Sequence, residues 1–89
     1  MTLQILSSPS KPDDVAQRLR DAIQGALPGA ALEVRATGAG HFEISVVSPR
    51  FEGQSRVDQQ RSVYAAIAPL MKGDAAPVHA VDKLETRAS

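Results

Sequence analysis

The 89-residue sequence contains no cysteine and no tryptophan. A chain without cysteine cannot form a disulfide, cannot use a thiolate nucleophile, and cannot build a zinc or iron–sulfur site from its own thiolates. Ten basic residues (Lys and Arg) are balanced by ten acidic ones, so the formal net charge is zero. The chain therefore lacks the basic excess that proteins held to nucleic acid by counterion release usually carry.

Long apolar runs and a signal peptide are also missing. No stretch is long enough to span a bilayer, and Met1–Ser10 lacks the basic region and apolar run that direct secretion. We therefore expect a cytoplasmic protein that does not contact a membrane. Phe42, Phe51 and Tyr64 are the only aromatic residues, and they make a light core for one small domain. Such a domain favours a binding surface over a deep pocket.

The first half of the chain is predicted to form a helix followed by a hairpin. Ser10 is suited to cap the helix, and Leu27-Pro28-Gly29 is suited to end it. Apolar residues recur between these points at helical spacing: Val15, Leu19, Ala22, Ile23 and Ala26. Residues 31–36 alternate between apolar and polar side chains, which predicts a strand. Residues 41–48 are predicted to form a second strand with Phe42, Ile44 and Val46 facing inward. Because residues 37–40 form only a short turn, these two strands must be antiparallel.

The second half is predicted to form a helix and a last strand. Ser55 and Asp58 have the spacing of a capping box, and Gly73 is suited to end the helix. The buried stripe of this helix is predicted to comprise Val57, Gln60, Val63, Tyr64, Ile67, Leu70 and Met71. Residues 77–84 are predicted to form the strand. The domain then spans residues 10–84, between a flexible leader (1–9) and a flexible tail (85–89).

The order helix–strand–strand–helix–strand predicts an α+β fold. A right-handed crossover through the second helix makes the second and third strands parallel if they are neighbours. The expected result is a three-stranded mixed sheet with both helices on one face, a two-layer sandwich.

No sequence pattern typical of an enzyme is present. The chain has no G-x-S-x-G, no H-E-x-x-H and no phosphate-binding glycine loop followed by a helix. Glu43 and Asp82 are predicted to be able to meet across the sheet, but paired catalytic carboxylates need an enclosing cleft. We therefore expect a protein that is not an enzyme.

Two histidines are the candidate functional residues. In Val78-His79-Ala80-Val81, alternation points His79 away from the helices, and His41 opens the second strand in a similar outward phase. Each is interpreted either as an ordinary surface imidazole or as a lone ligand for a metal centre that a partner completes.

Three ordered motifs resemble the BolA family. Residues 41–53 (HFEISVVSPRFEG) resemble its Ser-His-Phe…Val-Ser-x-x-Phe-x-Gly segment, and Val78–Val81 resembles its Ile-His-Ala-Leu strand. Ser55-Arg56-Val57 followed by Val63-Tyr64 is similar to its second helix, where Gln59-Gln60-Arg61 is closest to the IbaG/YrbA branch. The resemblance runs from Leu32 to Lys83 and implies the class II KH-like fold.

The resemblance also implies a function and a partner. BolA-like proteins pair with monothiol glutaredoxins, alone or around a bridging [2Fe–2S] cluster, in iron–sulfur trafficking or iron-linked regulation. His79 matches the family's cluster ligand, and glutaredoxin and glutathione would supply the thiolates that this chain lacks. Many members carry a His or Cys ligand between the first two strands, but Thr37–Gly40 offers neither. His41 therefore stays a second candidate, and alone the chain is expected to be a monomer or weak homodimer.

Two alternatives stay open. Some BolA proteins are DNA-binding transcriptional regulators of stress response or morphology. In that case Arg50, Arg56 and Arg61 would form a small basic face, with Phe51 either stacking on bases or anchoring the core. The KH Gly-x-x-Gly loop is absent from this turn. The other alternative is an interaction domain that holds no metal.

Overall fold

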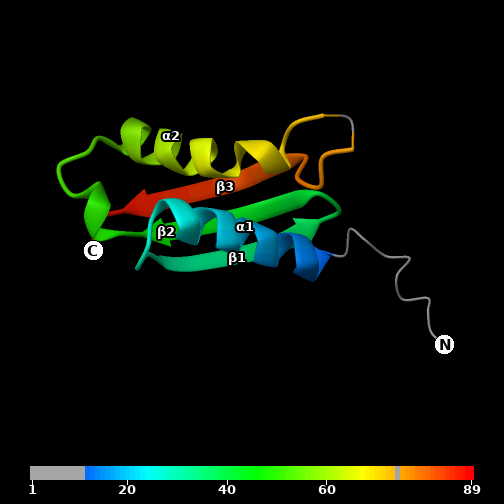
Figure 1. Ribbon diagram of the computed structural model, residues 1–89, viewed down its shortest axis with the longest axis horizontal. Helices are drawn as coiled ribbons and strands as arrows, with labels where there is room; N and C mark the ends of the chain where they lie inside the picture. The colour runs from blue at the N-terminus through cyan, green and yellow to red at the C-terminus, as the bar shows by residue number, and fades with distance from the viewer. Residues whose placement is uncertain (1–11, 74) are drawn as a thin grey trace.

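The computed structural model describes residues 12–73 and 75–89. Two α-helices, three β-strands and two short 3-10 helices follow one another along the chain (Figure 1). In order they are α1 (Pro12–Ala26), β1 (Ala31–Gly38), β2 (His41–Val47), η2 (Pro49–Phe51), α2 (Arg56–Ile67), η3 (Ala68–Leu70) and β3 (Ala80–Arg87).

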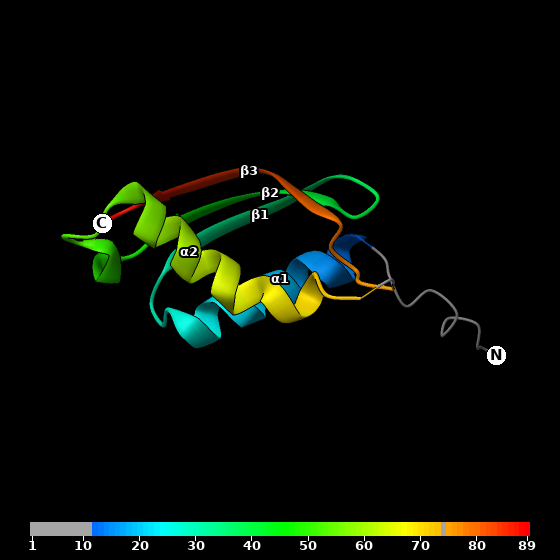
Figure 2. The same ribbon diagram turned by 90° about the horizontal axis from the view of Figure 1, so that it is seen from above.

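The strands form one mixed sheet in the order β1-β2-β3. β1 and β2 are antiparallel, and β2 and β3 are parallel because α2 carries the chain back across the layer. Both helices lie on the same side of the sheet, so its other face is open (Figure 2). The predicted α+β two-layer sandwich is therefore confirmed.

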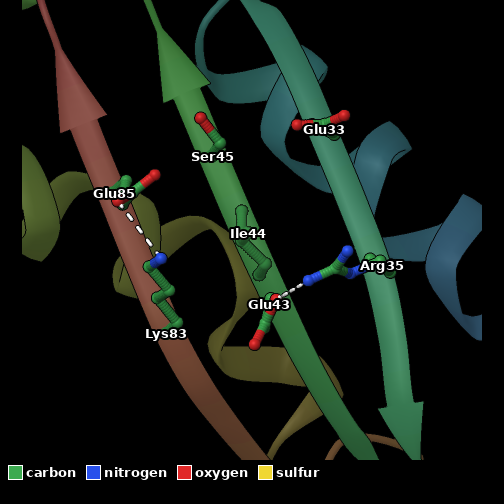
Figure 3. Close-up of a pocket in the computed structure, with 7 residues that line it drawn as sticks. All are labelled: Glu33, Arg35, Glu43, Ile44, Ser45, Lys83 and Glu85. Carbon is green, nitrogen blue, oxygen red and sulfur yellow. Dashed lines mark hydrogen bonds and ion pairs between the residues drawn. The ribbon is translucent and has the colours of Figure 1, made fainter.

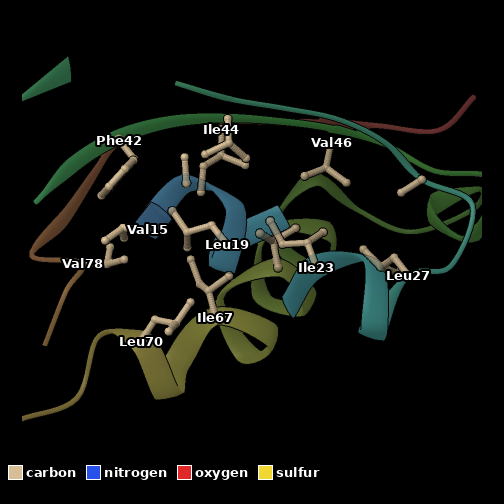
Figure 4. Close-up of a cluster of buried hydrophobic side chains, with 14 of the residues drawn as sticks. Val15, Leu19, Ile23, Leu27, Phe42, Ile44, Val46, Ile67, Leu70 and Val78 are labelled. Atoms are coloured by element: carbon tan, nitrogen blue, oxygen red, sulfur yellow. The ribbon is translucent and has the colours of Figure 1, made fainter. Parts of the chain in front are cut away.

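The core lies between the sheet and the helices (Figure 4). Alternate residues of β2 point into it, and α1 covers them with residues spaced one turn apart. The most completely buried of these side chains are Phe42, Ile44, Val46, Val15, Leu19 and Ile23. The inward phase predicted for β2 is confirmed, and the periodicity of α1 identifies its buried face correctly.

The buried stripe predicted for α2 is partly wrong. Val57 and Tyr64 are exposed to 55% and 40%, whereas Gln59 is buried. The buried positions of the helix are Gln59, Val63 and Ile67, followed by Leu70 of η3. The helix is turned so that the Gln59 amide reaches buried backbone and side-chain partners. The predicted capping of the helix by Ser55 is correct, since its Oγ accepts the Asp58 N–H at 3.1 Å.

The last strand lies three residues further along the chain than predicted. It begins at Ala80 and ends at Arg87, so residues 85–87 of the predicted tail are part of the sheet. Glu85, Thr86 and Arg87 pair with Ser45–Val47 of β2, and the Ser48 N–H donates to the Arg87 carbonyl at 3.1 Å. The predicted leader and the cap at Ser10 lie outside the described residues.

Side chains from both helices cover the outer edges of the sheet. On the β1 edge, Arg20 Nη2 donates to the Val34 carbonyl at 3.1 Å. On the β3 edge, Gln60 Nε2 donates to the Leu84 carbonyl at 3.3 Å. Neither described helix has the length and apolar character needed to cross a membrane.

Candidate functional site

His79 lies immediately before β3, beside the β1–β2 turn. Its backbone N–H donates to the Gly40 carbonyl at 2.8 Å, and the Ala80 N–H donates to the same oxygen at 3.0 Å. The preceding Val78 is buried in the core, while His79 itself is exposed. The His79 side chain is therefore exposed as expected, although the residue precedes β3. A small open hollow of about 220 Å³ adjoins it, lined by Met71, Gly73, Ala76, Val78 and His79.

The His41 side chain is hydrogen-bonded to the carboxylate of Asp82, a contact that the sequence pattern does not predict. Its Nδ1 lies 3.0 Å from Asp82 Oδ1, and the Thr37 hydroxyl donates to Asp82 Oδ2, also at 3.0 Å. A register irregularity produces this arrangement, because Phe42 pairs with Val81 but Glu43 pairs with Lys83. Asp82 is thus the extra residue of a β-bulge. The expected meeting of Glu43 with Asp82 is therefore wrong.

The two donors stabilise the charged form of Asp82. They lower the pKa of its carboxyl below the ordinary value, and the hydrogen bond from His41 has a larger effect than the one from Thr37. When the pKa of a carboxyl is lower in the folded protein than in the unfolded chain, its ionised form stabilises the fold. This stabilisation is fully present at pH values above the unfolded-state pKa, and it is lost as the pH falls through the folded-state pKa. The contribution of Asp82 to stability should therefore disappear in acid.

We expect the variant Asp82→Asn to be less stable than the wild type at about pH 7 and to approach it below about pH 4. Urea unfolding of both proteins across this range measures the difference. Glu52→Gln, which removes an exposed carboxylate after η2, is measured beside it as the control. A difference between Asp82→Asn and wild type that stays constant down to about pH 3 would contradict the assignment.

The open face of the sheet carries two ion pairs and a further acidic side chain, Glu33 (Figure 3). Arg35 of β1 pairs with Glu43 of β2, and Lys83 lies 3.5 Å from Glu85 within β3. The hollow between them holds about 200 Å³, and Ser45 is among the residues that line it. These exposed pairs contribute little to stability.

Within residues 12–73 and 75–89, no three metal-ligating side chains of His, Cys, Asp or Glu come together. The structure therefore does not bring His79 into a ligand set with other residues of this kind. One exposed imidazole fits the role of a single ligand in a centre that another molecule completes.

The arginines proposed for nucleic-acid binding do not form a stacking site. Arg50 and Arg56 are exposed, and Arg61 Nη1 lies 3.7 Å from Asp58 Oδ1. Phe51 is 1% exposed, so it anchors the core and the base-stacking interpretation is wrong. With Phe51 buried, the three arginines alone would provide weak, salt-sensitive contacts to phosphate.

Known proteins share both the sequence and the fold. Residues 19–88 match the family model described as BolA-like protein. BolA-like protein 1 of Homo sapiens is 37% identical in an alignment that covers 75% of this chain and 53% of that protein. The protein of the same name from Mus musculus is 34% identical with the same coverage. The chain thus spans about half the length of these curated relatives.

Solved structures agree with this assignment. The BolA1 protein from Mus musculus superposes with a TM-score of 0.66 at 31% identity, covering 88% of this chain and 66% of that one. BolA1 from Arabidopsis thaliana gives a TM-score of 0.67 at 26% identity, covering 82% and 89%. The match to the family model covers most of the described residues, including His79, the β1–β2 turn and all three strands of the sheet. The chain therefore belongs to the BolA-like protein family.

Proposed function

We propose that this chain is a non-enzymatic binding module that pairs with a monothiol glutaredoxin, in [2Fe–2S] cluster trafficking or iron-linked regulation. His79 supplies one nitrogen ligand to the cluster, and glutaredoxin and glutathione supply thiolates. The observation that carries the proposal is the exposed His79 imidazole, which stands at the end of the sheet with its backbone tied to the hairpin turn.

The donor set of the chain fits this role. A [2Fe–2S] cluster needs four ligands, and imidazole replaces thiolate at some irons in proteins. The chain has no cysteine. His79 therefore serves as a contributor to a shared centre, and the small hollow beside it gives a partner an open approach. When bound, the cluster would supply the redox and transfer chemistry, while this chain donates a ligand and a docking surface.

The role of His79 can be tested with a cluster-loaded monothiol glutaredoxin. Adding the wild-type protein should change the visible absorption and circular dichroism spectra, because one cluster ligand changes. His79→Ala should abolish this change and weaken binding to the loaded partner at least about tenfold. Both quantities are read in one titration. Identical spectra and affinities for wild type and His79→Ala would show that the ligand role is wrong.

His41→Ala tests the second candidate ligand, an exposed imidazole at the same end of the sheet. His41 Nδ1 is hydrogen-bonded to Asp82, and a carboxylate partner on one ring nitrogen is common for histidines that bind a metal through the other. A changed cluster spectrum in His41→Ala would identify His41 as a further ligand, and an unchanged spectrum would leave His79 as the histidine ligand. A parallel titration with cluster-free glutaredoxin separates docking from ligation. His79→Ala should affect the cluster-free complex much less than the loaded one.

A further inference from the structure

His79 and Gly40 are in direct contact although they are far apart in the sequence. A Cβ placed on Gly40 would lie 2.7 Å from Cδ2 of the His79 ring and 2.8 Å from Cγ. Ordinary van der Waals contacts of a Cβ lie at 3.4–4 Å. The imidazole therefore occupies the space that any other residue's side chain would need at position 40.

The contact also determines how the ring is presented. The three atoms of His79 nearest to the Cβ position are Cδ2, Cγ and its own Cβ, and neither ring nitrogen is among them. The Cγ and Cδ2 atoms of the imidazole thus lie nearest to the glycine, and both ring nitrogens lie further than these atoms from the Cβ position. The two backbone hydrogen bonds to the Gly40 carbonyl hold the main chain of His79 in the same place.

We propose that Gly40 is a positioning residue for His79, an inference that rests on the proposed function. The missing side chain of Gly40 lets the imidazole lie against the β1–β2 turn, and this packing restricts the orientations that the ring can adopt. The ligand is then pre-oriented before a partner arrives, which reduces the ordering cost of binding.

Gly40 has a second property that the test must separate from this role. Its φ is +75°, a left-handed conformation in which any other residue is strained. Gly53 provides the matched control, because its φ is +79° and a Cβ there would have no atom within 4 Å. Gly53→Ala therefore measures backbone strain alone, whereas Gly40→Ala adds the collision with the His79 ring.

The first experiment compares unfolding in urea. Gly53→Ala should raise the unfolding constant about five- to thirtyfold, the usual cost of a non-glycine residue at positive φ. Gly40→Ala should raise it at least about tenfold more. In the His79→Ala background most of this excess should disappear, and only the contact with the Cβ at position 79, at 3.2 Å, remains. If Gly40→Ala does not fold, recovery of folding in Gly40→Ala/His79→Ala supports the same conclusion. An excess that persists undiminished without the imidazole would overturn the inference.

The second experiment follows the His79 ring by proton NMR and repeats the cluster titration. Gly40→Ala should shift the Hδ2 and Hε1 signals of His79 and weaken its binding to cluster-loaded glutaredoxin, while Gly53→Ala should leave both unchanged. Unchanged ring signals in Gly40→Ala would overturn the inference, and so would shifted signals with wild-type binding. If His79→Ala itself binds the loaded partner like wild type, the proposed function fails, and the stability cycle still reports on the glycine–imidazole contact.

Discussion

Truncating Phe51 to alanine should lower the free energy of unfolding by about 3–5 kcal/mol. The side chain is 1% exposed and belongs to the single contiguous core of the described residues. A domain of this size has a total stability of about 5–15 kcal/mol, so the loss removes a large part of it. Urea denaturation followed by circular dichroism measures the change.

Tyr64→Ala is the control for Phe51→Ala, because it also removes an aromatic ring. Tyr64 is 40% exposed on the outer side of α2, so its truncation should cost much less. If the two variants lose equal stability, Phe51 is not the core anchor described above. The comparison also separates the core role of Phe51 from the base-stacking role, since a stacking ring would be dispensable for folding.

The second large effect is expected from a buried polar network around Gln59. Its Nε2 donates to the Gln54 carbonyl at 3.1 Å and to the Phe51 carbonyl at 3.4 Å, and its Oε1 accepts the Thr86 hydroxyl at 2.8 Å. Gln59 and Thr86 are 8% and 5% exposed. The network therefore joins α2 to the loop after β2 and to the end of β3. A buried polar group that loses its partner is costly, so each member depends on the others.

We expect Thr86→Val and Gln59→Met each to lower the free energy of unfolding by about 1–3 kcal/mol. The double variant should cost less than the sum of the two, because both substitutions remove the same hydrogen bond. Equilibrium unfolding of the four proteins completes this cycle. Ser62→Ala is the control, since its hydroxyl bonds the Asp58 carbonyl at an exposed site and should contribute little. Strict additivity of Thr86→Val and Gln59→Met would argue against a shared bond.

The order and type of the elements can be predicted from sequence because they depend on local patterns. In α1, apolar residues follow one helical stripe, and in β2 the buried Phe42, Ile44 and Val46 alternate with more exposed residues. The orientation of α2 is harder to predict, because apolar residues such as Val57 and Val63 lie on more than one side of it. Burial of the polar Gln59 decides which side faces the sheet. The end of β3 is also nonlocal, since polar residues continue a strand wherever a neighbour supplies backbone partners.

Some features of the candidate site can likewise be predicted from the sequence, and others cannot. The exposure of His79 follows from alternation beside a buried Val78, which is a local property of the sequence. Its contact with Gly40 depends on two segments that the parallel pairing of β2 and β3 brings together. The link between His41 and Asp82 depends on a bulge, and no spacing in the sequence reveals the extra residue. The proposed partner rests on the family resemblance together with the exposed His79 imidazole.

The side chains of Arg20 and Gln60 have a consequence for the behaviour of the protein in solution. A three-stranded sheet leaves two edges at which a foreign strand is able to pair and start aggregation. Arg20 and Gln60 each occupy a carbonyl acceptor in the middle of one edge, and the helices that carry them flank those edges. An incoming strand must first displace these donors. The two helices that cover the small core thus also oppose fibril growth at the edges of the sheet.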